Sequence, residues 1–182
     1  MRPALALLLT LGLAACTAEP DSAPAPVGQE AARDAELAAL KAELRADLPD
    51  VPTIAVDELA ARLDAGETPL LIDVRAADEY AVSHLRGARR AETPAEAEAL
   101  LEGVPNDREV IVYCSVGWRS GHLAQALRRE GRTNVRNLEG SIFEWANTGH
   151  PVWRGDEPVR AVHPYDAEWG RLLDRSLWAG LE

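Results

Sequence analysis

One cysteine stands where a predicted strand gives way to a predicted helix. An apolar, β-branched run ends at Tyr113, Cys114 follows it directly, and a helical pattern starts beyond Arg119. A loop in this position turns backbone N–H groups inward, and the positive end of the helix dipole favours negative charge there. With an arginine nearby, cysteines of this kind titrate at roughly 3.5–7.5 instead of about 8.5. We therefore predict that Cys114 is an activated sulfur nucleophile in an anion-binding loop.

The bulk composition limits the partners of such a nucleophile. The chain has 182 residues, 47% of them hydrophobic, which suits one domain of ordinary size with appendages. Its formal net charge of −11 argues against nucleic acid as a partner. The histidines lie far apart and no CxxC or HxxxH spacing occurs, so we predict neither a metal site nor a cofactor.

The first residues are typical of an export signal. Arg2 gives a positive start, and the apolar run 4–13 is too short to span a bilayer as a mature helix. The Leu-Ala-Ala that precedes Cys16 resembles the bacterial lipobox, which implies cleavage of residues 1–15 and lipidation of Cys16. Thr17 follows, not the aspartate that this resemblance links to inner-membrane retention.

We therefore predict a lipid-anchored protein of the bacterial cell envelope, on the outer membrane and facing the periplasm. Lipidation of Cys16 would leave Cys114 as the only thiol, so a dithiol switch within one chain is not expected. The alternative is an ordinary signal peptide with an incidental cysteine.

Two segments separate this signal from the main domain. Residues 17–28 are rich in proline, alanine and serine, which is typical of a flexible linker. Residues 29–50 form a predicted helical segment whose leucines share one stripe: Leu37, Leu40, Leu44 and Leu48. This helix packs on the domain, pairs with a second chain, or stays solvated; the sequence leaves the three open.

Residues 51–155 alternate between strand and helix patterns. We expect strands at 53–56, 70–75, 109–113 and 134–138, an edge segment after a turn at 84–88, and helices from Asp57 to Gly66, at 78–81, from Pro94, at 120–130 and at 142–148. This order predicts an α/β fold with a parallel sheet and helices on both faces. Because ligands of such sheets lie beyond the carboxyl ends of the strands, Asp73, Arg75 and Cys114 are expected to meet.

The last segment, residues 156–182, changes pattern again. Its apolar side chains fit one face of a C-terminal helix, which we expect to dock on the domain: Tyr165, Trp169, Leu172, Leu173 and Leu177. Binding of a partner through Trp169 and Trp178 is the alternative.

Four motifs follow one another in a fixed order between about Val51 and Arg154. They are Leu71-Ile-Asp73-Val-Arg75 with Glu79-Tyr80, His84-Leu-Arg-Gly87-Ala88, Cys114-Ser-Val-Gly117-Trp-Arg119-Ser120, and Leu138-Glu-Gly140-Ser-Ile-Phe-Glu-Trp145 with Gly149-His-Pro151. Together they resemble the rhodanese-like sulfurtransferase domain. The resemblance implies a five-stranded parallel sheet and a Cys114 that accepts sulfane sulfur as a persulfide. The donor would be a small sulfur anion such as thiosulfate, and the acceptor a thiol or cyanide.

The resemblance also assigns roles around the cysteine. The loop of Ser115, Val116, Gly117, Trp118, Arg119 and Ser120 would offer backbone N–H groups to the persulfide, with Gly117 permitting an unusual φ. Arg119 holds the anionic donor or braces the loop, and Trp118 forms a wall of the entrance or packs on the surface.

Four residues on other segments are expected to support the loop: Asp73, Arg75, Glu79 and His84. We expect Arg75 to pair with Glu79 and His84 to tie two segments together. The chain departs from the family at Ser83, Arg86 and Ser141, which puts local loop shape in doubt.

Two other functions compete with sulfur transfer. Cysteine phosphatases also place a thiolate and an arginine in a strand–loop–helix, but with five residues between them, and here Cys114 and Arg119 are separated by four. The second is a non-catalytic lipoprotein that keeps the fold for binding. Inactive relatives often lose the loop cysteine, which this chain retains.

Overall fold

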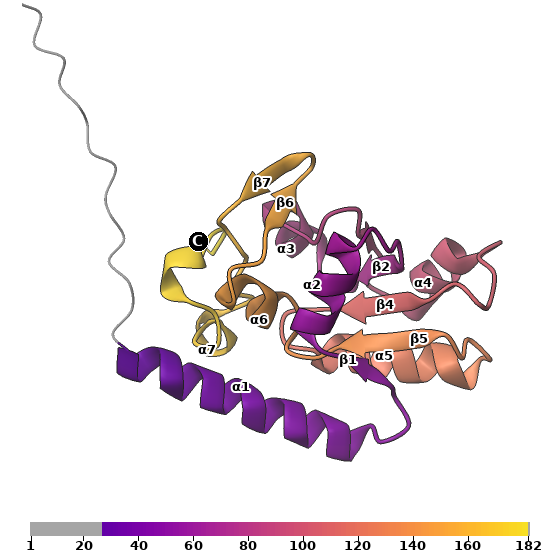
Figure 1. The fold of residues 1–182 in the computed structure, drawn as a ribbon, viewed down its shortest axis with the longest axis horizontal. Coiled ribbons are helices and arrows are strands. Elements are labelled where there is room, and N and C mark those ends of the chain that lie inside the picture. Colours follow the sequence, from indigo (N-terminus) through magenta and orange to yellow (C-terminus); the bar gives the residue numbers. More distant parts are fainter. Residues whose placement is uncertain (1–26, 182) are drawn as a thin grey trace, which may run out of the picture.

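A computed structural model describes residues 27–181 as one central sheet with helices on both faces (Figure 1). The predicted signal peptide (residues 1–15), the lipidation site Cys16 and most of the predicted linker (17–28) lie outside the described residues and stay predictions. Within residues 27–181, no helix has the length and apolar character that crossing a bilayer requires.

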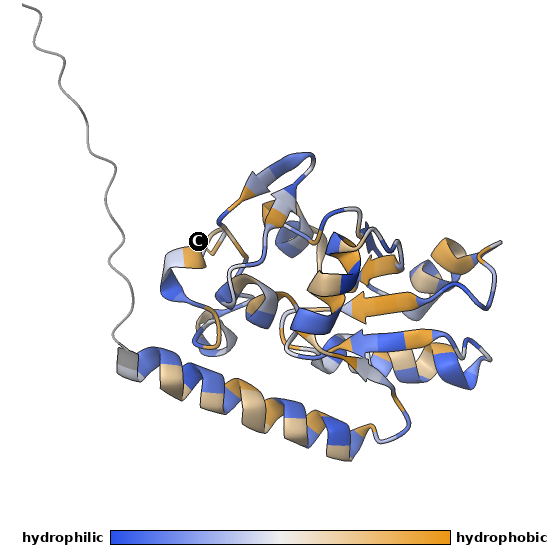
Figure 2. Ribbon diagram, viewed as in Figure 1, coloured by the Kyte–Doolittle hydropathy of each residue, from blue (hydrophilic) through white to orange (hydrophobic). Residues whose placement is uncertain are grey.

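The central sheet has five parallel strands in the order β1-β5-β4-β2-β3. Their bounds are β1 Thr53–Ile54, β2 Leu70–Asp73, β3 Arg89–Arg90, β4 Val110–Tyr113 and β5 Val135–Leu138. Every residue of β2 and β4 is buried, as expected for parallel strands covered on both faces. Figure 2 shows both strands as apolar. The predicted five-stranded parallel sheet is confirmed.

The helices bury one apolar cluster on each face of the sheet. Their bounds are α2 Val56–Asp64, α3 Ala77–Val82, α4 Pro94–Leu101, α5 Trp118–Arg129 and α6 Ser141–Asn147. Helices α2 and α6 contribute to one cluster, and α4 and α5 to the other. Along β4, Ile111 and Tyr113 join the first cluster while Val110 and Val112 join the second, because successive strand residues point to opposite faces.

Helix ends follow the sequence signals at α4 but not at α2. Helix α4 begins at Pro94, and the Thr93 hydroxyl accepts a hydrogen bond from Glu96 N at 3.3 Å, which makes a capping box. Helix α2 begins at Val56 with Ala55 as its N-cap, so the expectation that Asp57 caps it is wrong. Asp57 lies in the first turn, where its charge complements the helix dipole.

The N-terminal helix α1 (Val27–Asp47) packs on the domain. Leu37 and Leu44 are each 4% exposed, and they belong to the two opposite core clusters, so α1 bridges the two layers. Ion pairs fix the exposed side of the contact, with Lys41 Nζ 2.7 Å from Glu144 and Arg45 Nε 2.5 Å from Glu139. Of the three arrangements left open by the sequence, the structure shows packing on the domain.

The C-terminal region differs from the single helix expected there. It contains an antiparallel hairpin that was not predicted, one short helix and one 3₁₀ turn, with the bounds β6 Val152–Arg154, β7 Glu157–Val159, α7 Ala167–Gly170 and η1 Arg175–Leu177. Tyr165 has φ +70°, which a helix does not allow, and Asp166 and Asp174 each cap a new short element. Leu172, Leu173 and Leu177 are nevertheless buried, so the apolar spacing reports docking and not one continuous helix.

Candidate active site

Cys114 lies in a tight loop between the end of β4 and the start of α5. Gly117 is the N-cap of α5 and has φ +105°, a left-handed conformation that glycine adopts without steric cost. This bend brings Gly117 N to 3.1 Å from Cys114 Sγ, and the amide donates a hydrogen bond to the sulfur. The loop therefore turns at least one backbone donor toward the thiol.

The start of α6 holds the other side of the loop. The backbone N–H of Cys114 donates to Ser141 Oγ at 3.1 Å, and Phe143 N donates to Ser115 O at 3.0 Å. Ser141 itself has φ +50°. Ser141, which departs from the family pattern, thus fixes the cysteine backbone, a contact that was not predicted from the sequence. In the sequence, the indication of this role is that Ser141 directly follows Gly140.

A polar residue on β5 also braces the loop. Asn137 Nδ2 donates to Gly117 O at 2.9 Å, and Ser120 Oγ donates to Asn137 Oδ1 at 2.7 Å. Asn137 is 1% exposed, so both of its amide groups are used inside the protein. Asn137 could not be predicted as a site residue, because its expected strand, residues 134–138, carries no other sign of a polar function.

The surroundings of Cys114 favour its thiolate. Burial raises the pKa of this thiol, but the positive charge of Arg119 and hydrogen bonds from Ser120 and Gly117 outweigh burial, so the pKa lies below its ordinary value. Among residues 27–181 it is a free cysteine with no disulfide partner. A lowered pKa gives a larger thiolate fraction at neutral pH, and the thiolate is the reactive form.

Arg119 is bound tightly to its neighbours. Its two terminal nitrogens each lie 2.8 Å from an oxygen of Glu79, and Nη2 also donates to Ser115 Oγ at 2.9 Å. Glu79 is 2% exposed; burial raises the pKa of its carboxyl, but hydrogen bonds and positive charges around it, chiefly from Arg119, together outweigh burial, so the pKa is lowered. Of the two roles considered for Arg119, this geometry is that of a brace.

The expected pairing of Arg75 with Glu79 is wrong. Arg75 is fully buried and pairs with Asp73, with Nη2 2.7 Å from Asp73 Oδ2. Arg75 Nη2 also donates to Ser83 O at 2.5 Å, and Glu79 is left to pair with Arg119. Asp73 and Arg75 therefore form a buried scaffold at the end of β2, separate from the ion pair beside Cys114.

His84 connects two distant segments. Its backbone N–H and C=O exchange hydrogen bonds with Trp153 at 2.9 and 2.8 Å, which joins the loop after α3 to β6. The ring stacks on Tyr80 with centroids 4.0 Å apart, and its Nδ1 lies 3.1 Å from Tyr80 O. The structure thus places His84 as a tie between segments.

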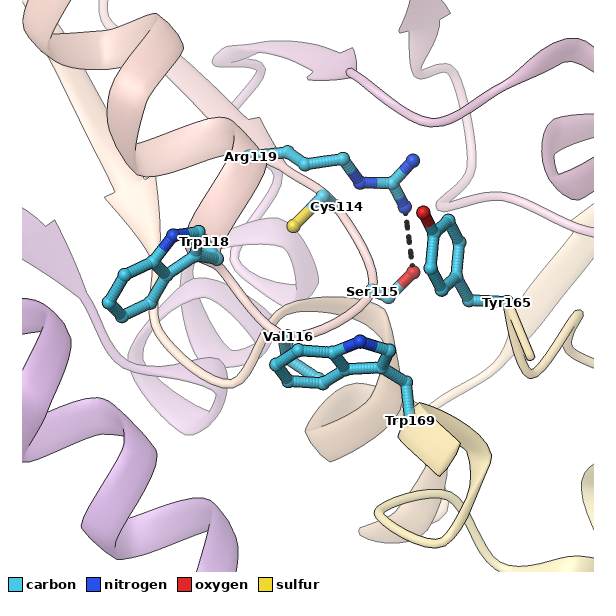
Figure 3. A pocket seen from close by; sticks show the side chains of 7 residues that line it. All are labelled: Cys114, Ser115, Val116, Trp118, Arg119, Tyr165 and Trp169. Carbon is cyan, nitrogen blue, oxygen red and sulfur yellow. Dashed lines mark hydrogen bonds between the residues drawn. The ribbon is translucent and has the colours of Figure 1, made fainter. Parts of the chain in front are cut away.

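A cavity of about 150 Å³ opens beside Cys114 (Figure 3). Its lining residues are Cys114, Ser115, Val116, Trp118, Arg119, Tyr165 and Trp169. Five of these are predicted loop residues, while Tyr165 and Trp169 come from the C-terminal region, where the sequence predicted packing, with binding of a partner through Trp169 as the alternative. Figure 3 shows the two aromatic side chains beside Ser115 and Val116, close to the cysteine.

Known proteins resemble this chain in both sequence and fold. A family model described as a rhodanese-like domain matches residues 55–148. The chain is 33% identical over 96 residues to a protein named sulfurtransferase from Allochromatium vinosum, which covers 53% of this chain and 89% of that protein. It is also 33% identical over 100 residues to the probable adenylyltransferase/sulfurtransferase MoeZ of Mycobacterium tuberculosis, which covers 54% of this chain.

These matches differ in how much of each known protein they include. The match to MoeZ spans only 26% of that longer protein. Among solved structures, a thiosulfate sulfurtransferase from Pseudomonas aeruginosa superimposes with a TM-score of 0.56 at 24% identity, over 74% of this chain and 26% of that one. The likeness to that structure concerns the fold. Tyr165 and Trp169 lie beyond the residues that the family model matches.

Proposed function

We propose that this chain, which belongs to the rhodanese-like domain family, is a sulfurtransferase in which Cys114 carries sulfur as a persulfide. The observation that carries this proposal is the placement of Cys114 Sγ, which lines a cavity and accepts a hydrogen bond from Gly117 N at 3.1 Å. The lowered pKa of the thiol supports the same role. Relatives named as sulfurtransferases support the reaction class.

The proposed reaction consists of two displacements at sulfur. The Cys114 thiolate attacks the outer sulfur of a donor such as thiosulfate; an S–S bond to Cys114 forms, the S–S bond of the donor breaks, and sulfite leaves with its electron pair. A thiolate or cyanide then attacks the outer sulfur of the persulfide, and Cys114 leaves as a thiolate. Gly117 N and the charge of Arg119 stabilise that leaving thiolate, so each step gains from the same loop.

The rival functions have less support from the site. Cysteine phosphatases place five residues between the cysteine and the arginine of this loop, and here four residues separate Cys114 from Arg119. A non-catalytic binding role would need no depressed thiol pKa, and Cys114 has one. The gain of sulfur on Cys114 separates this binding role from catalysis.

Mass spectrometry after incubation with thiosulfate tests the persulfide directly. Purified residues 17–182 should gain one sulfur on Cys114 and transfer it to cyanide. The Cys114→Ser variant should stay folded and lose both properties. In the full-length chain, Cys16→Ser is the matched control and should keep both, because it changes the other cysteine. Folded protein that never gains sulfur would favour the binding role.

We also propose that the protein is anchored to the bacterial outer membrane by lipid on Cys16. The lipobox-like residues before Cys16 support this, and the proline-, alanine- and serine-rich composition of residues 17–28 suits a tether. Several acyl chains would bury many methylene groups at about 0.8 kcal/mol each, enough for stable anchoring. Radiolabelled palmitate should label the full-length chain in cells and leave Cys16→Ser unlabelled; equal labelling of both would contradict the anchor.

A further inference from the structure

The wall of the cavity opposite the catalytic loop comes from the C-terminal extension, which we define as residues 156–181. Tyr165 and Trp169 line the cavity together with Trp118, so three aromatic side chains surround the space beside Cys114 (Figure 3). The extension is held firmly: Asn147 Nδ2 donates to Leu172 O and Asp174 N donates to Asn147 Oδ1, each at 2.8 Å. The two aromatic walls are therefore fixed features of the site.

The cavity offers few polar partners to a sulfur acceptor. Its seven lining residues, all within the described part of the chain, include one basic side chain, Arg119. That guanidinium is bonded to the buried Glu79 carboxylate, so its N–H donors on that side are already used. Its Cζ lies over the Tyr165 ring, 4.9 Å from the ring centroid. A polar acceptor group would lose water here without gaining new partners, so the cavity favours an apolar acceptor group.

Tyr165 is held in a conformation that its side chain disfavours. Its φ is +70°, and a bulky residue with positive φ is a genuine outlier. Its side chain is nevertheless 46% exposed, so burial of the ring does not account for the strained backbone. Backbone strain of this kind concentrates at ligand-binding sites. The residue instead places its ring beside Arg119 at the edge of the cavity.

We propose that the C-terminal extension selects the sulfur acceptor, and that this acceptor is an organic thiol with an apolar, aromatic-sized group. The inference rests on the proposed function and adds the class of substrate. The group would pack between Trp118, Trp169 and Tyr165 while its sulfur faces Cys114. The size agrees, because an apolar cavity of about 150 Å³ holds one benzene-sized molecule.

The transfer step balances without any further reactant. The acceptor thiolate R–S⁻ attacks the outer sulfur of the Cys114–S–SH persulfide. A new S–S bond forms to the acceptor, the S–S bond to Cys114 breaks, and Cys114 leaves as a thiolate with the bonding electron pair. The product is R–S–SH, the proton stays on the transferred sulfur, and there is no net oxidation.

Single-turnover transfer to two thiols tests the proposal. Cys114 is first loaded with thiosulfate or inorganic polysulfide, and the added sulfur is verified by mass spectrometry. Loaded protein is then mixed with phenylmethanethiol or with 2-mercaptoethanol, at equal thiolate concentrations. The wild-type protein should react at least about tenfold faster with phenylmethanethiol, equivalent to about 1.4 kcal/mol.

Three variants assign that preference to the extension. Trp169→Ala should lower the preference about tenfold, and Trp169→Phe should restore most of it. Tyr165→Asn should lower the preference without lowering the melting temperature, because asparagine tolerates positive φ. Trp153→Ala is the matched control: Trp153 lies on β6, stacks on Arg86 and does not line the cavity, so the preference should stay.

The possible failures are distinguishable. Protein that does not load sulfur from either probe overturns the sulfurtransferase function, and this inference with it. Protein that loads but transfers to both thiols at equal rates overturns the inference alone. A large fall in melting temperature in Tyr165→Asn would show that the strained residue serves the fold, and would overturn its assignment to the cavity.

Discussion

Helix α1 and the C-terminal extension both reach the loop that carries Cys114, but they contact different parts of it. A methyl group built on Gly117 would lie 3.3 Å from Leu44 Cδ2 of α1, so α1 packs on the backbone that shapes the loop. The extension instead places Tyr165 and Trp169 at the cavity. None of the seven lining residues comes from α1.

This difference separates two ways in which added segments act on one site. A residue packed behind the loop changes the geometry of every donor around Cys114, and so the reactivity of the thiol. A residue that lines the cavity changes which molecule reaches a thiol of unchanged reactivity. Substitutions behind the loop should therefore change stability and thiol reactivity, and substitutions in the cavity wall should change neither.

Leu44→Ala should have the largest effect. Leu44 is 4% exposed, and deletion of a buried leucine side chain costs about 2–5 kcal/mol of unfolding free energy. The loop would also lose its support at Gly117, so the pKa of Cys114 should rise. Urea unfolding gives the stability, and the pH dependence of iodoacetamide alkylation gives the pKa.

Leu37→Ala is the matched control, because Leu37 is equally buried on the same helix but belongs to the other core cluster. It should cost a similar free energy and leave the thiol pKa unchanged. Equal pKa shifts in the two variants would show that α1 acts through overall stability and not through the loop.

Gly117→Ala should have the next largest effect, because alanine at φ +105° is strained. We expect a loss of about 1–2 kcal/mol in unfolding free energy and at least a tenfold slower loading of sulfur. Gly131→Ala provides the control, since Gly131 has φ +99° with open space around it and lies at the far end of α5. It should lose similar stability and load sulfur normally. Normal loading by Gly117→Ala would mean that loop shape is not limiting.

The pH profile of Cys114 should depend on the loop and not on the cavity wall. Because the pKa of Cys114 is lowered, alkylation should rise with pH through a midpoint below the ordinary thiol value. Arg119→Gln removes the largest of the lowering causes, so the midpoint should move up by about one pH unit. Trp169→Phe should leave it in place. A shifted midpoint in Trp169→Phe would contradict the division between the two regions.

The conformation of the Cys114 loop could be predicted from the sequence better than the contacts around it. The loop 114–120 and the buried strands are local patterns, in which a few consecutive residues specify both conformation and chemistry. Asn137 and Ser141 contact the loop only because the parallel sheet aligns the ends of β4 and β5, so their roles depend on tertiary structure. Trp169 shares its spacing with buried leucines, and periodicity does not distinguish a side chain that lines a cavity from one that packs in the core.

The smallest effect should come from the ion pairs at the rim of α1. Arg45 bonds Glu139, next to the Gly140–Ser141 segment that holds the Cys114 backbone, while Arg171 bonds Glu36 at a contact between α1 and the extension. Burial raises the pKa of Glu139, but hydrogen bonds and positive charges around it, chiefly from Arg45, together outweigh burial, so the folded pKa is lowered. A lowered carboxyl pKa stabilises the fold above the unfolded pKa, and this contribution disappears as pH falls through the folded pKa.

Arg45→Gln should therefore cost about 0.2–1 kcal/mol at neutral pH and nothing in acid. Arg171→Gln should cost less, because both partners in that pair are nearly half exposed and screened by solvent. Urea unfolding at two pH values and two salt concentrations measures both. If Arg171→Gln costs as much as Arg45→Gln, α1 is held equally by the domain and by the extension, and the two flanks do not act independently.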